Sequence, residues 1–154
     1  KSWLNAYRSL FMEELSFPPI SDEKNLRYAS QIKSSLSVGV HIRRGDFLTL
    51  GVSLDSKFYY SAIQKLLASH PDSTLFVFSD DLSWCELHKE ELGLTLAKEV
   101  IFIRGNINGK NYIDMQLLSM CKGMIISNSA FCYLAALLNS NLDFYINFTK
   151  WRQL

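Results

Sequence analysis

The sequence predicts an α/β fold, a Rossmann-like parallel sheet of about five strands with flanking helices. Short apolar runs alternate with segments of helical periodicity along most of its 154 residues, which is the pattern that βαβ units produce. Several of the expected strands, such as residues 74–78, are apolar at consecutive positions, as a strand requires when both faces of its sheet are covered. The length fits one domain that buries roughly two-thirds of its unfolded surface.

Two helices are expected before the first strand. Residues 3–15 carry apolar side chains at helical spacing, and the proline at position 18 cannot continue that helix. A second helix is expected over residues 22–34. Its apolar stripe consists of Leu26, Ala29 and Ile32. We assign residues 1–36 to a helical lead-in and residues 37–154 to the Rossmann-like domain.

The elements that follow alternate between strand and helix. The helix after the first strand, for example, repeats large apolar residues at Tyr59, Ile63 and Leu66, the spacing of one helical face. An alternating order of this kind favours a parallel sheet with crossover helices. The expected strands cover residues 37–42, 74–78, 99–103, 123–126 and 143–148, and the expected helices cover residues 56–69, 81–92, 112–122 and 130–138.

Charged and polar residues gather directly after the strands. In open parallel sheets, ligands bind beyond the carboxyl ends of the strands, where the N-termini of helices also point. This edge of the sheet is therefore expected to hold an anionic ligand. The segments in question are His41-Ile42-Arg43-Arg44-Gly45-Asp46, Ser79-Asp80-Asp81, Arg104-Gly105-Asn106 and Ser127-Asn128-Ser129.

Adjacent arginines at a strand end need a negative partner. The five fixed donors of a guanidinium match a phosphate or a carboxylate, so Arg43 and Arg44 are candidate phosphate ligands. The alternative is a structural network in which they pair with Asp46 and Glu residues. His41 lies on the same strand face as Arg43, although a histidine inside a strand is more often packed in the core.

Other candidate residues also have an ordinary structural explanation. Ser127, Asn128 and Ser129 can cap the following helix, bind a phosphate, or do both. Asp114 lies near the start of its helix, where a carboxylate suits the helix dipole without any ligand. Asp80 and Asp81 are likewise ordinary N-cap residues.

Composition and missing motifs exclude several classes of protein. Sixteen Lys and Arg against fifteen Asp and Glu leave a formal charge of +1, without the basic stripe that nucleic-acid binding needs. Three cysteines without CxxC spacing argue against a disulfide framework and a zinc site, and indicate buried thiols in a reducing compartment. No GxxxxGK[ST], GxGxxG or GxSxG motif is present, and no apolar run approaches the length of a membrane span.

Three segments, in this order, resemble the bacterial α-1,2-fucosyltransferase family, glycosyltransferase family 11. The stretch 41–46 matches the family's HxRRxD motif, and residues 114–131 are similar to its later motif, which runs from an acidic residue through an SNS-type turn into a helix. Residues 131–139 resemble an FSWWAAWLN-like helix in which Cys132 and Tyr133 replace the more usual Ser and Trp. The resemblance covers residues 37–151, including the closing Lys150-Trp151.

The resemblance implies a two-domain glycosyltransferase of the GT-B kind, with this chain as its donor-binding half. Such an enzyme transfers L-fucose from GDP-β-L-fucose to a glycan hydroxyl, here a galactoside, and forms an α-1,2 linkage with inversion and without a metal or another cofactor. Arg43 would hold the β-phosphate and serve catalysis, with His41 and Arg44 in the same donor site. Asp114 would bind the guanine. Ser127, Asn128 and Ser129 would close around the phosphates, and Asp46, Asp80 and Phe131 would support them.

The resemblance also has a gap. The family's N-terminal GGxGNQ segment and the acceptor half that follows it are absent, and the chain begins at Lys1, so we expect a piece of a longer protein. Asp46 is the nearest candidate for the catalytic base, but it is equally suited to holding an arginine, and the base is otherwise expected in the missing half. The alternative function is a non-catalytic nucleotide- or glycan-binding module of the same fold. The expected location is cytoplasmic or peripheral to the inner membrane.

Overall fold

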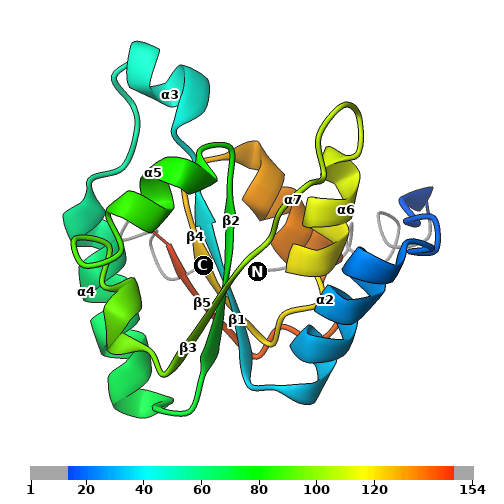
Figure 1. The fold of residues 1–154 in the computed structure, drawn as a ribbon, viewed down its shortest axis with the longest axis horizontal. Coiled ribbons are helices and arrows are strands. Elements are labelled where there is room, and N and C mark those ends of the chain that lie inside the picture. Colours follow the sequence, from blue (N-terminus) through cyan, green and yellow to red (C-terminus); the bar gives the residue numbers. More distant parts are fainter. Residues whose placement is uncertain (1–13, 148–154) are drawn as a thin grey trace, which may run out of the picture.

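The computed structural model describes residues 14–147, which form a five-stranded parallel sheet with helices on both faces (Figure 1). This confirms the predicted fold class. The strands are β1 (Ser37–Ile42), β2 (Thr74–Ser79), β3 (Glu99–Phe102), β4 (Gly123–Ile126) and β5 (Phe144–Asn147). The helices are α2 (Glu23–Ser34), α3 (Gly45–Thr49), α4 (Ser56–Ser69), α5 (Leu82–Leu87), α6 (Asn111–Leu118) and α7 (Ala130–Leu138), with a 3₁₀ turn η1 (Leu94–Leu96).

The strand order β3-β2-β1-β4-β5 places the first strand in the centre of the sheet. The chain builds outward from β1 through β2 to β3, and then returns to add β4 and β5 on the other side of β1. In such a sheet the reversal of direction opens a crevice beyond the carboxyl ends of the central strands. His41 pairs with Phe78 across β1 and β2 at that end of the sheet.

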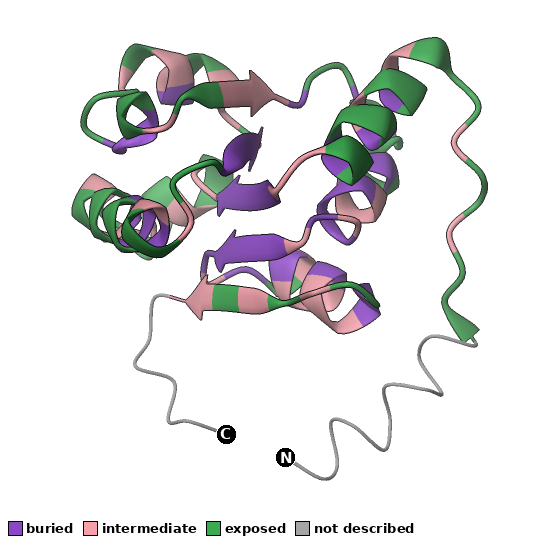
Figure 2. Cartoon of the chain, turned by 90° about the horizontal axis from the view of Figure 1, so that it is seen from below, coloured by how far each residue is buried: buried purple, intermediate pink, exposed green. Residues whose placement is uncertain are grey.

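The central strands are buried because helices cover both of their faces. All residues of β1 and β4 are buried, whereas the edge strands β3 and β5 are partly exposed (Figure 2). Alternate residues of one strand therefore belong to two separate cores. One core joins Val38, Val40, Ile42, Leu75, Val77 and Ile125 to Tyr59, Ala62, Ile63 and Leu66 of α4.

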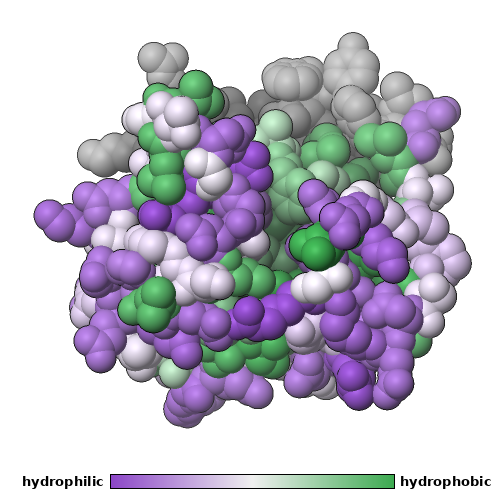
Figure 3. All heavy atoms as spheres, turned by 45° about the horizontal axis from the view of Figure 1, so that its top comes forward, coloured by the Kyte–Doolittle hydropathy of each residue, from purple (hydrophilic) through white to green (hydrophobic). Residues whose placement is uncertain are grey.

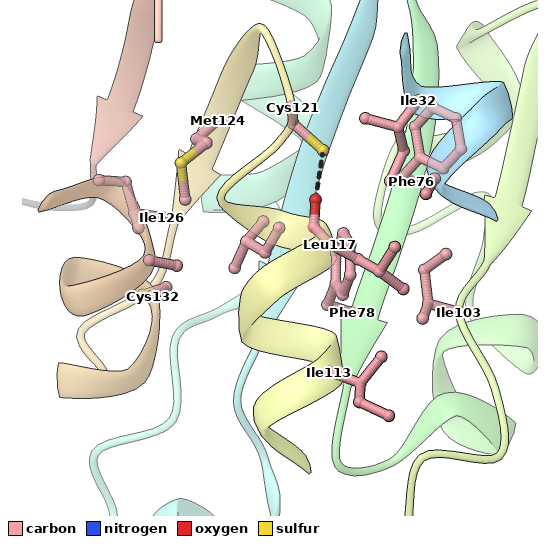
Figure 4. Packing of buried hydrophobic residues seen from close by; sticks show 13 residues of the cluster. Ile32, Phe76, Phe78, Ile103, Ile113, Leu117, Cys121, Met124, Ile126 and Cys132 are labelled. Atoms are coloured by element: carbon pink, nitrogen blue, oxygen red, sulfur yellow. Dashed lines mark hydrogen bonds between the residues drawn. The ribbon is translucent and has the colours of Figure 1, made fainter. Parts of the chain in front are cut away.

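The other core lies between the sheet and helices α2, α6 and α7 (Figure 4). Phe76 and Phe78 of β2 meet Ile32 of α2 and Leu117 of α6 there. Gly39 in β1 allows α6 to approach closely, since a Cβ at this position would collide with the Leu118 side chain. Helix α2 therefore belongs to the same core as the sheet.

The exposed side of α2 differs from the prediction. Leu26 was expected in the apolar stripe, but it is 49% exposed, and Asn25 is buried in its place with 1% exposure. The buried positions of the helix are Asn25, Ala29 and Ile32. A polar side chain is tolerated there because it is fully hydrogen-bonded.

Some predicted boundaries are also wrong. The helix expected over 81–92 ends at Leu87, because the chain turns at Gly93, with φ +75°, to bring both Leu92 and Leu94 into the core. Helix α3 was not expected, and α6 ends at Leu118 instead of residue 122. Almost all of the helix predicted over residues 3–15, and the pair Lys150-Trp151, lie outside the described residues.

Candidate functional site

A cleft of about 400 Å³ opens at the carboxyl edge of the sheet. Figure 3 looks toward this edge and shows apolar atoms in a hollow between more hydrophilic projections. The ends of β1, β2 and β3 and the first turns of α6 and α7 supply its walls. The lining residues are His41, Arg43, Phe78, Ser79, Asp80, Leu82, Ile103, Gly105, Asn106, Ile107, Asn111, Asp114 and Phe131.

Arg43 enters the cleft directly after β1. Its two terminal nitrogens contact Asp46 Oδ1 at 2.7 Å and Asp80 Oδ2 at 3.1 Å, and 35% of the side chain is exposed. The expected pairing with Asp46 is therefore present, and the same guanidinium also faces the cleft. Because it is partly exposed, Arg43 is available to exchange a carboxylate for another anion.

Arg44 points elsewhere. Its guanidinium lies 3.4 Å from the centre of the Trp84 ring and its Nε is 3.4 Å from Asp81 Oδ2. Its side chain is 16% exposed. It is not among the residues that line the cleft, so its contacts hold α5 against the turn after β1.

Asp80 organises that turn. Its Oδ1 accepts the backbone N–H of Arg44 at 2.9 Å, while Oδ2 contacts Arg43. A Cβ at position 45 would collide with the same carboxylate, so Gly45 lets the turn pass close to Asp80. The N-cap of α5 is Asp81, which accepts from Trp84 N at 3.1 Å. The N-cap prediction is thus confirmed for Asp81 and wrong for Asp80, whose carboxylate binds the arginine segment instead.

His41 is a buried, neutral side chain in the cleft wall. Burial, followed by the charge of Arg43, lowers its pKa from 6.5 to about 3. Its ring stacks on Phe131, with centroids 5.3 Å apart, and its Nδ1 lies 2.7 Å from Ser127 Oγ. A neutral imidazole has one donor and one acceptor nitrogen. When the Ser127 hydroxyl donates to Nδ1, the other nitrogen carries the hydrogen.

The Ser127-Asn128-Ser129 turn lies behind the cleft wall. Ser127 is fully buried beneath His41, and Ser129 caps α7 by accepting from Phe131 N at 3.4 Å. The Asn128 amide donates to Val52 O at 2.8 Å, which ties the segment after α3 to this turn. None of the three lines the cleft. In this structure Ser127 contacts His41, and the capping expected of the turn is made by Ser129, which binds the backbone of Phe131.

Asp114 lies in the first turn of α6, as expected, and lines the cleft. Its Oδ1 accepts from Asn106 Nδ2 at 2.7 Å. Burial raises its pKa from 3.8 to about 6, although the bond from Asn106 and the charge of Lys24 act in the opposite direction. The carboxyl group is therefore half-buried and ionised only above mildly acid pH.

The cleft thus combines five of the expected residues, namely His41, Arg43, Asp80, Asp114 and Phe131. Sequence reasoning placed Asn106 after the third strand but gave it no role, and it missed Asn25. The signal for Asn25 was a polar residue four positions before the buried Ala29, on the core side of α2.

Metal-binding side chains do not cluster within residues 14–147, where no group of three or more His, Cys, Asp or Glu is placed to hold an ion. Cys85, Cys121 and Cys132 are buried free thiols, as expected. No helix in the described part of the chain is both long and apolar enough to cross a membrane.

Comparisons with known proteins agree with this architecture. The model of the family described as "Glycosyl transferase family 11" matches residues 13–153. An α-1,2-colitosyltransferase of Escherichia coli is 35% identical over an aligned length of 143 positions, and the alignment covers 88% of this chain and 48% of that protein. The O-antigen biosynthesis glycosyltransferase WbnK of Escherichia coli is 33% identical over 75% of this chain and 39% of that protein.

An animal protein and a solved structure are similar as well. The galactoside 2-α-L-fucosyltransferase Sec1 of Mus musculus is 30% identical over 75% of this chain and 32% of its own length. The crystal structure of fucosyltransferase NodZ from Bradyrhizobium superposes with a TM-score of 0.51 at 19% identity, covering 88% of this chain and 58% of that one, and it supports the fold alone. The chain spans about half or less of the length of these curated relatives.

Proposed function

Because the chain belongs to glycosyltransferase family 11, we propose that it is the donor-binding part of an α-1,2-fucosyltransferase of the GT-B kind. The substrate is GDP-β-L-fucose, and the product is an α-1,2-fucosylated glycan formed with inversion. The observation that carries the proposal is that Arg43 and Asp114 line one cleft at the carboxyl edge of the sheet. The cation suits the diphosphate of a guanosine diphosphate, and the carboxylate suits its guanine base.

Arg43 binds the diphosphate end. Phosphate oxygens replace Asp46 or Asp80 as partners of its guanidinium. The two terminal nitrogens can bind a phosphate without reorienting, because a phosphate and a carboxylate accept hydrogen bonds in the same geometry. His41 lies beside it as a neutral hydrogen-bond donor. The turn at Ser127, Asn128 and Ser129 acts indirectly, because it contacts the residues that form the wall of the cleft. Arg44 contributes by holding the turn, through its contacts with Trp84 and Asp81.

Asp114 binds the base. An ionised carboxylate accepts hydrogen bonds from the N1–H and the 2-amino group of guanine, whereas uracil and adenine offer an acceptor at one of these positions. The bond from Asn106 uses one acceptor site of Oδ1, and an ionised carboxylate has further acceptor sites on its two oxygens for the two donors of guanine. A preference for guanine nucleotides follows.

Fucosyl transfer needs negative charge to be stabilised on the departing GDP. A preorganised guanidinium supplies this stabilisation where the charge develops, without a metal ion. The acceptor hydroxyl must also lose a proton. Asp46 is bound to Arg43 at 2.7 Å, which favours a supporting role over that of a base, so we assign the base and the acceptor site to the rest of the protein.

The names of the relatives bear on both the linkage and the donor sugar. Two of the relatives are named for transfer to a 2-position, but one of these names specifies colitose and the other L-fucose. Colitose is fucose without its 3-hydroxyl group. The galactoside acceptor is proposed from the name of the Mus musculus relative.

The test is a transfer assay with the complete protein in EDTA, using GDP-fucose, GDP-colitose and a β-galactoside. An α-1,2-linked fucosyl product identified by NMR supports the proposal. If only a colitosyl product forms, the donor sugar is colitose and not fucose. Binding of GDP-fucose without transfer of either sugar would favour the alternative, a non-catalytic nucleotide-binding module.

A further inference from the structure

A buried pair of amides connects α2 to the wall of the cleft. Asn25 Nδ2 donates to Asn106 Oδ1 at 2.8 Å, and Asn106 Nδ2 donates back to Asn25 Oδ1 at 3.0 Å. The side chains are 1% and 5% exposed. Asn106 follows β3 and lines the cleft, whereas Asn25 lies behind it. The two residues are 81 positions apart in the sequence. Burying their amides costs free energy unless the hydrogen-bonding groups of both are satisfied.

The orientations of the two amides in this reciprocal pair are fixed by the groups beside them. Asn25 Nδ2 also contacts both carboxylate oxygens of Asp22, at 3.0 and 2.9 Å. A carboxylate only accepts, so the amino group of Asn25 must face Asp22 and its carbonyl must face Asn106. The amino group of Asn106 therefore points to Asn25 and Asp114, where it donates at 2.7 Å. Both hydrogens of each amino group are used.

Few other groups act on Asp114. Lys24 Nζ lies 3.4 Å from Asn106 Oδ1, and its charge lowers the pKa of Asp114, as does the bond from Asn106. Arg43 and Asp80 line the same cleft after β1 and β2 and are paired with each other, and His41 in its wall is neutral. Asp22 is separated from Asp114 by the two amides.

We propose that Asn25 is a positioning residue for nucleotide selection: it fixes the Asn106 amide, which in turn holds the Asp114 carboxylate in its ionised, base-accepting orientation. This inference rests on the proposed function, because it takes Asp114 as the group that binds guanine. Asn25 itself does not touch the nucleotide. Its effect is transmitted through one amide and is therefore visible in the titration of Asp114.

The main variant is Asn25→Ala. Without Asn25, the Asn106 amide keeps Lys24 and Asp114 as partners but loses its two bonds to Asn25. Its bond to the charged form of Asp114 is then held less firmly, so the titration midpoint of Asp114 rises, by at most about one pH unit. The GDP-over-UDP affinity ratio falls at pH 6.5 and recovers toward pH 8.5. Because GDP and UDP carry the same diphosphate, its own titration affects both affinities equally and cancels in their ratio. Asn139→Ala is the matched control. Asn139 lies at the end of α7, is as deeply buried as Asn25, and donates its side-chain amide to Cys121 O.

Carboxyl ¹³C NMR gives the Asp114 midpoint without any ligand, and calorimetry gives the affinity ratio. In the wild-type chain, the side-chain amide signals of Asn106 and Asn25 must shift with the same midpoint as Asp114, a result that needs no variant to fold. Asn25→Ser replaces Asn25→Ala if thermal unfolding shows that the alanine variant is not folded.

The results separate the two proposals. A wild-type chain that binds GDP and UDP equally at every pH contradicts the proposed function. If the wild-type chain prefers GDP, the inference is overturned by an Asn25 variant with an unchanged midpoint and an unchanged affinity ratio. Amide signals that do not follow the Asp114 titration overturn it as well.

Discussion

Asp114→Asn should stabilise the folded chain at neutral pH while removing its preference for GDP. The carboxyl group is held in a half-buried position by Asn106, and burial raises its pKa from 3.8 to about 6. Keeping the charged form there opposes folding, because the unfolded chain ionises this group more easily. An asparagine has the same shape, and its carbonyl still accepts the bond from Asn106.

The size of the effect follows from the two pKa values. A difference of about two pH units at 1.36 kcal/mol each sets an upper limit of about 3 kcal/mol. The asparagine amide must also leave water, so a gain of about 1 to 2 kcal/mol is expected. The sign depends on pH: a raised carboxyl pKa favours folding below pH 3.8, and this contribution is lost as the pH rises through about 6.

Urea unfolding of both proteins at pH 4 and pH 8 measures this difference. The variant should be more stable at pH 8 by the stated amount. At pH 4 it should be no more stable than the wild type, or slightly less stable, because the cost of burying the amide remains while the charge penalty has largely disappeared. An equal gain at both pH values, or no gain at pH 8, would refute the reasoning that Asp114 is held as a costly charge.

Three further predictions concern the arginines, the sheet and His41. Arg43→Lys in the complete enzyme should reduce kcat by roughly a hundred- to a thousandfold, whereas Arg44→Lys should mainly lower the melting temperature; a larger kcat loss at Arg44, with both variants folded, would reverse the roles. Gly39→Ala should cost about 1 to 3 kcal/mol in urea unfolding, since the new Cβ collides with Leu118, and an unchanged urea midpoint would contradict this contact. His41 has a lowered pKa, so wild-type stability that is present above pH 6.5 should be lost as the pH falls toward about 3. His41→Gln should flatten that decline, and parallel pH curves for the two proteins would argue against a buried neutral imidazole.

The gathering of the site residues could be predicted because the sheet is parallel. Arg43, Asp80 and Asp114 are far apart in the sequence, but each follows a strand or begins a helix at the same edge, and the structure brings them into one cleft. The order of strands and helices was enough for Arg43 and Asp80, whereas Asp114 was placed in the site by the resemblance to the family. The same rule also brought Ser127 and Ser129 to the edge, although these two are buried behind the wall.

The direction of individual side chains could not be predicted in this way. Adjacent residues on a helix point about 100° apart, so choosing Asn25 instead of Leu26 for the buried side of α2 would have required knowledge of what lies opposite. The partner that makes Asn25 acceptable in the core is Asn106, 81 positions later in the chain. Apolar periodicity contains no information about such a pair.

Calorimetric titration of GDP and UDP into the chain in EDTA, repeated with Asp114→Ala, tests the central claim most directly. We expect the wild-type chain to bind GDP without a divalent metal and to prefer it over UDP, because Arg43 meets the diphosphate and Asp114 selects the base. Asp114→Ala should retain diphosphate binding and lose the preference. Equal, negligible heats for GDP and UDP with the wild-type chain, or an unchanged GDP-over-UDP ratio in a folded Asp114→Ala variant, would contradict the claim that this cleft binds a guanosine diphosphate.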